Sequence, residues 1–407
     1  MIDIPLDDLK KTAINKFLDT VEVFEDSLNK NIITQKKYDE KIEETKNTII
    51  NEVLTGASED LKPFDYIGIE KELSAKFELV LSNYDNYDIS QFSADKMYKK
   101  YYDSITRENK NKISTNFEKF DKVLKGIPSG LTIVTALSSL GKSTFCIQLA
   151  DQIAMSGNKV LYMNAEMQNH HTWIKSIIRL SGNYAQLSFQ DIMNIENQSD
   201  AKIKSFIKAQ EDYNKYSHNI VIKKCSKMWL KELYRDIEAL KKINDDKPPV
   251  VFIDYLQILQ PLVDSKSKGN EYIHINEIMN ALKILIQDTG AYIIAISSLN
   301  RASYDKPISL SSLKGSGNLE YSADFVMAIQ PNKNDFVEAE PIYNNKTGNY
   351  NSNLINQWKR KKDKNITINI LKNRMGITGV EFDFIFQSAK AKFIACDVLD
   401  DRQRFLG

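Results

Sequence analysis

Residues 131–153 read LTIVTALSSLGKSTFCIQLADQI, in which an apolar, β-branched stretch leads through a short polar loop into a helical pattern. A strand, a tight loop and a helix that begins at Gly-Lys-Ser aim backbone N–H groups at phosphates, assisted by the positive end of the helix dipole. Lys142 would then reach the β- and γ-phosphates of a nucleotide, and the Ser143 hydroxyl would ligate Mg²⁺. Ala136 stands where the pattern GxxxxGK[ST] has its first glycine. The predicted nucleotide-binding residues of this loop are Ala136, Ser138, Ser139, Gly141, Lys142, Ser143 and Thr144.

The composition limits the classes of protein to which the chain can belong. Its 407 residues are enough for about two or three domains with a large core. The net charge of +1 gives no overall attraction to nucleic acid, so any basic surface must be local. Three scattered cysteines indicate reduced thiols in a cytoplasmic protein rather than a disulfide framework. Because no signal peptide or apolar run of membrane-spanning length is evident, we expect no membrane partner.

The chain changes character near residue 113. Before it, charged segments such as residues 9–28 and 36–54 place apolar residues three and four positions apart, which predicts amphipathic helices. The polar run that ends at residue 112 is typical of a linker. We therefore predict a helical interaction or oligomerisation region with its linker over residues 1–112, and an ATPase domain over residues 113–407.

Strand and helix patterns alternate in the second part. Strands that are apolar on both faces and are joined by helices predict an α/β fold, with a mostly parallel central sheet flanked by helices. In such sheets ligands bind at the carboxyl ends of the strands. The predicted strands are residues 131–136, 159–164, 219–223, 250–254, 292–297 and 325–330, and the predicted helices include residues 229–243 and 272–288.

Two of these strands lead into a carboxylate. The run PVVFID ends at Asp254, which is typical of a residue that holds Mg²⁺ or its water shell beside Ser143. The run VLYMNAE ends at Glu166, just after the strand that follows the phosphate-loop helix. A carboxylate there could accept the proton of the attacking water, so we predict Glu166 to be the catalytic base.

The order of the motifs gives the chain a resemblance to the C-terminal domain of DnaB-type replicative helicases, a RecA-like P-loop NTPase core, from about residue 113 to residue 393. The P-loop of that family normally begins with alanine, as it does here at Ala136. The run IDYLQ at residues 253–257 is the most diagnostic. The other matching runs are FEKFDKVLKGIPSG at residues 117–130, NAEM at 164–167, SLNR at 298–301, LKGSGNLEYSAD at 313–324 and KNRMGITG at 372–379.

The resemblance implies an ATP hydrolase that assembles into a ring, by analogy hexameric, around single-stranded DNA, with ATP and Mg²⁺ as cofactors. It assigns to Arg374, with Lys372 beside it, the stabilisation of charge on the phosphoryl group that a neighbouring subunit transfers. A primase or a helicase loader is the further partner it implies. The expected location is the cytoplasm of a bacterium, where the chain would serve the bacterium itself, a bacteriophage or a mobile element.

The candidate DNA contacts are lysines in two loops. Lys266 and Lys268 follow the Asp254 motif, and Lys314 lies in the LKGSG run, where the family has arginine. Contacts of lysines with the phosphate backbone would be independent of DNA sequence and sensitive to salt. The polar stretch at residues 331–365 is interpreted as an insertion, and its basic run at residues 358–362 is either a solvated face or a nucleic-acid patch.

Two alternatives to a helicase stay open at this stage. A recombination or repair ATPase of the RecA/RadA type can also carry the Lys-Asn-Arg-x-Gly run, although the Tyr255-Leu256-Gln257 run argues against it. A non-translocating ATP-dependent regulator is the other, because Ser298 stands where the family has a glutamine that senses the γ-phosphate. Hydrolysis of ATP with and without single-stranded DNA, beside unwinding of a forked duplex, separates the three.

Overall fold

The fold is taken from a computed structural model, which describes residues 6–29, 34–56, 63–82, 93–94, 97–98, 102, 112–165, 167–225, 228–260, 271–300, 305–313 and 316–396. The chain divides into two compact units, Met1–Thr106 and Arg107–Gly407. Each unit has a hydrophobic core of its own. None of the described helices is long and apolar enough to cross a membrane.

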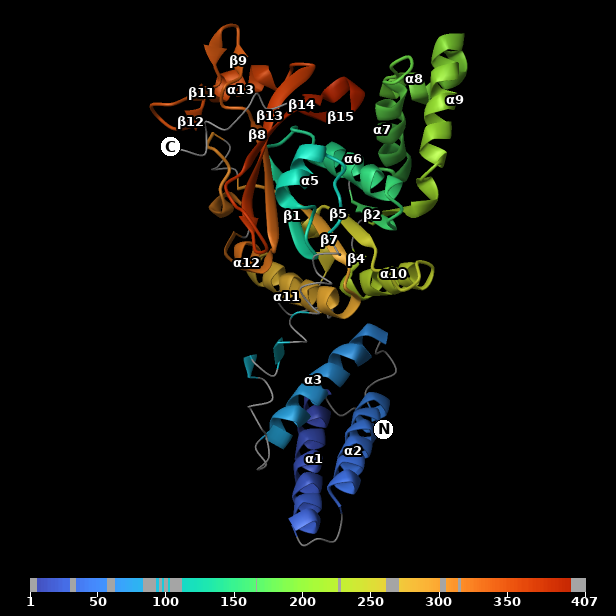
Figure 1. Cartoon of the computed structure of the whole chain (residues 1–407), viewed down its shortest axis with the longest axis vertical. Helices are drawn as coiled ribbons and strands as arrows, with labels where there is room; N and C mark the ends of the chain where they lie inside the picture. The colour runs from blue at the N-terminus through green and yellow to red at the C-terminus, as the bar shows by residue number, and fades with distance from the viewer. Residues whose placement is uncertain are drawn as a thin grey trace. The chain divides into compact units, whose positions relative to one another are not determined.

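The described part of the N-terminal unit includes the helices α1 (Leu6–Asn29), α2 (Gln35–Gly56) and α3 (Pro63–Ser82), shown in blue in Figure 1. Their buried apolar residues recur four positions apart, as in Ile69, Leu73 and Phe77 of α3, so each helix turns one stripe inward. Phe17 of α1 stacks on Phe77 with ring centroids 4.2 Å apart. The helices predicted at residues 9–28 and 36–54 are confirmed.

The larger unit is built on a nine-stranded sheet with the order β15-β14-β13-β8-β1-β7-β5-β2-β3. Six neighbouring strands are parallel, and most of them are buried along their whole length. This confirms the predicted α/β fold and all six predicted strands. The parallel strands are β1 (Gly130–Ala136), β2 (Val160–Asn164), β3 (Ile220–Lys224), β5 (Val250–Asp254), β7 (Tyr292–Ser297) and β8 (Phe325–Pro331).

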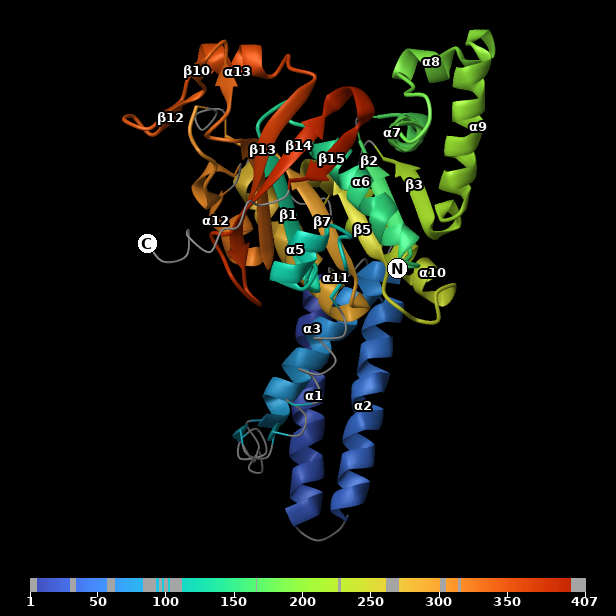
Figure 2. The same cartoon turned by 45° about the horizontal axis from the view of Figure 1, so that its top comes forward.

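Helices cover both faces of this sheet (Figures 1 and 2). The chain moves in one direction along the sheet from β1 to β3 and in the opposite direction from β3 to β8, and right-handed crossovers then place the helices of the two halves on opposite faces. One face carries α6 (Lys142–Met155), α7 (Asn169–Ser181), α8 (Phe189–Met193) and α9 (Asp200–Asn214), and the other carries α10 (Leu230–Lys242), α11 (Glu271–Thr289) and α12 (Ser316–Ser322). A short helix, α5 (Glu118–Leu124), precedes β1.

Three antiparallel strands extend the sheet beyond β8, and the sequence patterns did not predict them. They are β13 (Asp363–Asn373), β14 (Glu381–Gln387) and β15 (Lys392–Ala395). Phe386 of β14 stacks on Phe393 of β15 with centroids 4.4 Å apart, and Phe393 meets Phe145 of α6 edge to face. These strands therefore complete the hydrophobic packing around the amino end of α6.

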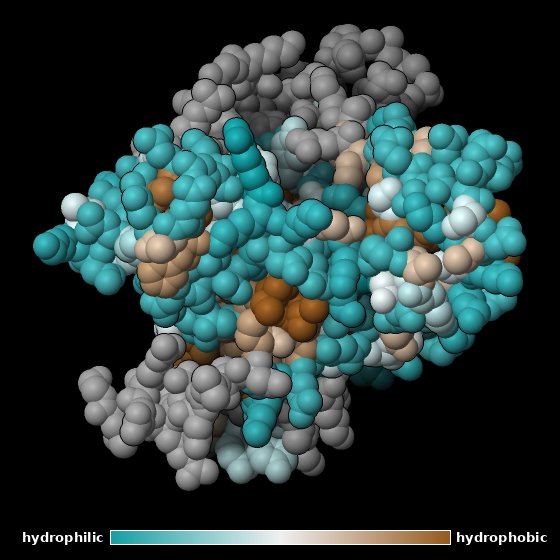
Figure 3. Space-filling model, turned by 90° about the horizontal axis from the view of Figure 1, so that it is seen from above, coloured by the Kyte–Doolittle hydropathy of each residue, from teal (hydrophilic) through white to brown (hydrophobic). Residues whose placement is uncertain are grey.

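The insertion between β8 and β13, here residues 332–362, is folded. It contains the short strands β9 (Phe336–Val337), β10 (Glu340–Pro341), β11 (Tyr343–Asn344) and β12 (Asn349–Tyr350), and the helix α13 (Ser352–Trp358). Trp358 is fully buried and donates its indole N–H to Asp335 at 2.6 Å. Lys361 also donates to Asp335, at 3.3 Å, so this part of the predicted basic run supports the fold of the insertion. Figure 3, seen from the side of the insertion, shows a mostly hydrophilic surface with small apolar patches among the described residues.

Candidate active site

The loop from Ala136 to Gly141 connects the carboxyl end of β1 to the amino end of α6. Gly141, just before the helix, has φ +79°, and a Cβ atom at this position would come within 2.7 Å of the Phe386 ring. Glycine is thus required both for the backbone turn and for the packing against β14. The turn leaves the first N–H groups of α6 directed at the end of the sheet, where an anion can accept from them.

A cavity of about 370 Å³ lies at this end of the sheet and is lined by all eight residues predicted to bind the nucleotide. The loop contributes seven of them, and Asp254 at the end of β5 contributes the eighth. Ser298, which follows β7, lines the same cavity. The complete lining is Ala136, Ser138, Ser139, Gly141, Lys142, Ser143, Thr144, Lys175, Asp254, Tyr255, Ile296, Ser298 and Leu299.

Two lysines enter this cavity from different elements. Lys142, the first residue of α6, donates to the carbonyl oxygen of Ala136 at 3.1 Å, so its ammonium group curls back over the loop. Lys175 of α7 donates to the Thr144 hydroxyl at 3.3 Å. Burial lowers the pKa of Lys175, and the field of Asp254 offsets this only in part. A buried ammonium group is costly unless an anion accompanies it, and a phosphate in the cavity would supply that charge.

Sequence reasoning missed Lys175. It lies on a helix among buried neighbours such as Ile174 and Ser176, where a lysine is unusual. The apolar residues on either side of it in the sequence, such as Ile174 and Ile177, gave only a weak signal, and no motif includes the residue.

Asp254 is held by the strand beside it. Tyr162 of β2 donates its hydroxyl to the Asp254 Oδ2 at 3.1 Å, and the Asp254 carbonyl accepts from the N–H of Ala165 at 2.8 Å. Burial, and then the neighbouring Asp254 charge, raise the pKa of Tyr162 well above its ordinary value, so the phenol remains protonated as a donor. The tyrosine therefore orients a carboxylate that lines the cavity.

The donor atoms present suit Mg²⁺. The Ser143 hydroxyl and the Asp254 carboxylate are the hard oxygen ligands that this ion prefers. Within the described parts of the chain, no three His, Cys, Asp or Glu side chains come together closely enough to hold a metal ion by themselves. The ion would accordingly be shared between these two side chains, nucleotide phosphates and water, which is the usual arrangement for Mg²⁺.

Lys372 and Arg374 lie away from this cavity, near the amino ends of the parallel strands β1 and β8. The N–H of Arg374 donates to the carbonyl of Asp324 at 2.9 Å, and the N–H of Asp324 donates to Leu131, near the start of β1. The nucleotide loop begins at the other end of β1, five residues on, which is roughly 17 Å along the strand at about 3.3 Å per residue. In Figure 1 α12, next to Asp324, lies at the lower end of β8, and the insertion lies at its upper end. The structure does not bring these two cations to the cavity of their own chain.

Four predicted site residues lie outside the described residues: Glu166, Lys266, Lys268 and Lys314. The last residue of β2, Asn164, is in register with Asp254, and Glu166 follows two positions later in the sequence. The assignments of the base and of the DNA-contacting lysines stay predictions.

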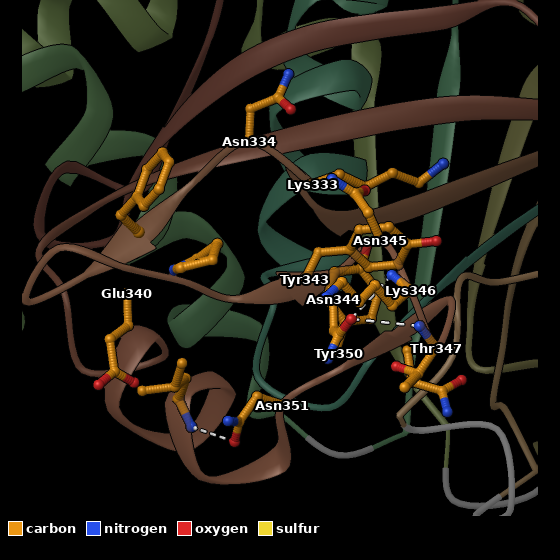
Figure 4. A pocket seen from close by; sticks show the side chains of 14 residues that line it. Lys333, Asn334, Glu340, Tyr343, Asn344, Asn345, Lys346, Thr347, Tyr350 and Asn351 are labelled. Atoms are coloured by element: carbon orange, nitrogen blue, oxygen red, sulfur yellow. Dashed lines mark hydrogen bonds between the residues drawn. The ribbon is translucent and has the colours of Figure 1, made fainter.

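A second cavity, of about 750 Å³, lies on the insertion (Figure 4). Glu340 lines one side, and Tyr343 and Lys346 line the other. Asn351 lies at the amino end of α13, where its side chain accepts from the N–H groups of residues 353 and 354 at 3.1 and 3.3 Å. Because this helix end is already capped, it lacks the open donors that α6 directs at its cavity. The smaller cavity is therefore the better candidate for a phosphate-bearing ligand.

Comparison with known proteins gives a match over the larger unit. Residues 112–395 match the family described as the DnaB-like helicase C terminal domain. The chain is 28% identical over 253 residues to the replicative DNA helicase DnaB of Buchnera aphidicola subsp. Baizongia pistaciae, which covers 60% of this chain and 50% of that protein. It is 25% identical over 251 residues to the DnaB of Geobacillus stearothermophilus, covering 59% and 50%. The chain thus spans about half the length of the curated relatives it matches.

Two solved structures share the fold. One is an ATPase domain, which aligns with a TM-score of 0.60 at 21% identity and covers 75% of this chain and 99% of its own. The other is a DnaB-like replicative helicase, described together with its interactions with primase, which aligns with a TM-score of 0.60 at 18% identity over 89% of this chain and 81% of its own.

Proposed function

The chain belongs to the DnaB-like helicase C terminal domain family, and on that premise we propose that it hydrolyses ATP between the subunits of a ring. In this proposal the ring, by family analogy a hexamer, moves along single-stranded DNA and unwinds duplex DNA during replication in a bacterial cytoplasm. The chain would serve the bacterium itself, or a bacteriophage or mobile element that acts in the bacterial cytoplasm.

The separation of Arg374 from the cavity of its own chain is the observation that carries the proposal. Its backbone is bonded to Asp324 at the amino edge of the sheet, whereas Lys142 and Asp254 lie at the carboxyl edge. Phosphoryl transfer gains most of its rate from charges positioned around the transferring group. A cation that is fixed near the amino ends of the strands can raise the rate of phosphoryl transfer only if it contacts the nucleotide of another subunit.

The residues of one site then divide the work between two subunits. Lys142, Lys175 and the N–H groups at the start of α6 would bind the phosphates, while Ser143 and Asp254 would hold Mg²⁺. When bound, the ion neutralises negative charge on the β- and γ-phosphates. Glu166 would accept the proton of the attacking water. Arg374 and Lys372 of the neighbouring subunit would stabilise charge on the phosphoryl group as it is transferred.

Mixing two inactive variants tests this division. Lys142→Ala removes the phosphate contact and keeps Arg374, whereas Arg374→Ala keeps an intact P-loop. Neither variant alone should hydrolyse ATP, but mixed rings contain interfaces in which an intact P-loop faces an intact arginine. We expect hydrolysis, measured as phosphate release, to reappear on mixing. A mixture as inactive as its components would contradict an intersubunit site.

A second candidate function follows from Ser298. Its side chain lines the cavity, but it is shorter than the glutamine that the family resemblance leads one to expect there. A non-translocating ATP-dependent regulator would hydrolyse ATP at a rate indifferent to DNA. The helicase proposal expects hydrolysis to rise with single-stranded DNA and a forked duplex to be unwound. A third pattern, stimulation by DNA without unwinding, would instead favour a RecA/RadA-like recombination or repair ATPase.

The N-terminal unit, whose described part includes α1, α2 and α3, is our candidate for interaction or oligomerisation. Its core is separate from that of the ATPase unit, and its surface carries ion pairs such as Lys16 with Glu52 at 2.5 Å. A primase or a helicase loader is the partner class we propose for the assembled protein. Removal of the helices α1 to α3 should abolish that interaction in a pull-down while leaving nucleotide binding by the larger unit.

A further inference from the structure

We infer that Asp324 is a positioning residue, which holds the guanidinium group of Arg374 in the orientation needed at a neighbouring subunit. The inference rests on the proposed function, because it concerns the residue that would complete the other subunit's site. It assigns a role to a carboxylate that lies at the amino edge of the sheet, away from the nucleotide cavity.

The position of the Asp324 carboxylate is fixed by the start of β1. Its Oδ2 accepts from the N–H of Leu131 at 2.9 Å, and its own N–H donates to the carbonyl of Leu131 at 2.8 Å. Gly130 has φ +107°, and a Cβ atom there would lie 2.3 Å from Oδ2. The glycine therefore makes the space that the carboxylate occupies, and β1 supplies the donor that holds it.

The other oxygen of the carboxylate faces Arg374. Its Oδ1 accepts from Nη1 of Arg374 at 2.9 Å, and the main-chain N–H of Arg374 donates to the Asp324 carbonyl, also at 2.9 Å. The second amino group, Nη2, donates to the carbonyl of Tyr321 in the last turn of α12. Backbone and side chain of the arginine are thus both held at one place.

The exposure of the pair indicates that it serves orientation more than stability. Arg374 retains 47% of its side-chain exposure, and an ion pair that is this open to water adds little to folding stability. A planar guanidinium group held at two of its nitrogen atoms, however, has few orientations left, and further N–H groups face solvent for a phosphate to accept from. Preorganised donors of this kind matter most in the transition state.

Lys372 offers an internal contrast. Its ammonium group donates to the carbonyl of Glu320, also at the end of α12, and burial lowers its pKa. It has no carboxylate comparable to Asp324 among its hydrogen-bond partners in the described residues. Asp324 and Glu320 act on Lys372 only through their charge, which partly offsets the lowering of its pKa, whereas Arg374 donates a hydrogen bond to the Asp324 carboxylate.

Asp324→Asn tests the inference because the amide oxygen can still accept from the N–H of Leu131, while the negative charge is lost. We expect kcat for ATP hydrolysis to fall about tenfold, with KM for ATP and the affinity for an ATP analogue unchanged, because the arginine acts in the transition state. In mixed rings, Lys142→Ala subunits, which keep Asp324 and Arg374, should restore hydrolysis by Asp324→Asn subunits. Asp363→Asn, at the other end of β13, is the matched control and should leave kcat unchanged.

The outcomes separate this inference from the proposed function. If Arg374→Ala hydrolyses ATP at the normal rate, the proposed role of Arg374 at a neighbouring subunit is wrong. If Arg374→Ala is inactive but Asp324→Asn has a normal or raised kcat, only the positioning role is overturned. A fall in ATP affinity or no restoration on mixing would also overturn it. Should thermal unfolding show that Asp324→Asn does not fold, Asp324→Ser, whose hydroxyl can accept from Leu131, carries the same expectation.

Discussion

Charged groups at the carboxyl ends of the parallel strands differ in exposure from those at the amino ends of the same strands. At the carboxyl ends of the strands Asp254 is buried and hydrogen-bonded to Tyr162, and Lys175 is partly buried. At the amino edge Arg374 is about half exposed and rests on Asp324. Burial prepares one edge to enclose a ligand of its own subunit, and exposure leaves the other edge able to contact a second molecule. The variants below test this division, beginning with the largest expected effect.

Lys142→Ala should have the largest effect, because it removes the lysine of the P-loop from the cavity. Without the ammonium group that curls over the loop, ATP hydrolysis should fall at least about 1000-fold, the upper end of the loss seen for one preorganised charge contact. Phosphate release and binding of a fluorescent ATP analogue measure the two parts of the effect. Lys159→Ala is the control, since Lys159 bonds to Asn219 away from the cavity. A Lys142→Ala variant with appreciable turnover would remove the P-loop from the proposed mechanism.

Arg374→Ala should be nearly as damaging to turnover but not to binding. The loss of an arginine that acts from a neighbouring subunit lowers kcat by about 1000-fold or more, and the nucleotide contacts of the subunit's own cavity remain. Single-turnover hydrolysis beside analogue binding separates the two. Arg360→Ala, an exposed arginine of the insertion, should behave as the wild type. Weakened binding in Arg374→Ala would contradict a role of the arginine that is confined to the transition state.

Lys175→Met should lower kcat/KM by about 10- to 100-fold, because it removes a partly buried cation from the lining of the cavity. Burial lowers the pKa of Lys175, so the ammonium form is lost at a lower pH than for an exposed lysine. We therefore expect wild-type activity to decline on the alkaline side, and Lys175→Arg to move that decline to higher pH. Identical alkaline profiles for the wild type and Lys175→Arg would exclude the lysine as the titrating group.

Tyr162→Phe should have the smallest effect of the four. The lost hydrogen bond to the Asp254 carboxylate lowers the free energy of unfolding by about 1.5–3 kcal/mol, as is typical of a hydrogen bond to a charged group. A less firmly oriented carboxylate should also raise, about threefold, the Mg²⁺ level needed for half-maximal hydrolysis. Tyr350→Phe is the matched control, since its hydroxyl bonds to the Pro331 carbonyl in the insertion. If both variants shift the Mg²⁺ requirement equally, Tyr162 has no particular role in holding Asp254.

The parallel half of the sheet was predictable because burial on both faces leaves a continuous apolar run in strands such as β5 and β7. The P-loop and Asp254 could be predicted as site residues because the motifs that contain them depend on local spacing. β13 was missed although Ile366, Ile368 and Ile370 alternate with polar residues, as is typical of a strand, because its first residues were assigned to the insertion at residues 331–365. The buried residues of the insertion, which include Ile342, Tyr350, Ile355 and Trp358, follow no periodic pattern from which its fold could be predicted.

The parts of the site that depend on tertiary contacts were beyond the sequence. Lys175 meets Thr144 across 31 residues and Tyr162 meets Asp254 across 92, so no motif contains either pair. Asp324 was quoted within a family motif, but its bond to Leu131 joins positions 193 residues apart. Residue type and spacing identify groups that are able to bind or catalyse. The partners that orient those groups depend on the folded structure.

The placement of Arg374 far from the cavity of its own chain implies that activity depends on protein concentration. A chain whose catalytic cation serves only another copy holds its substrate when alone but cannot consume it. The rate per chain should then depend on protein concentration, rising steeply where mass action favours assembly and vanishing well below it. Unassembled subunits would then hydrolyse no ATP, because hydrolysis begins only when subunits associate.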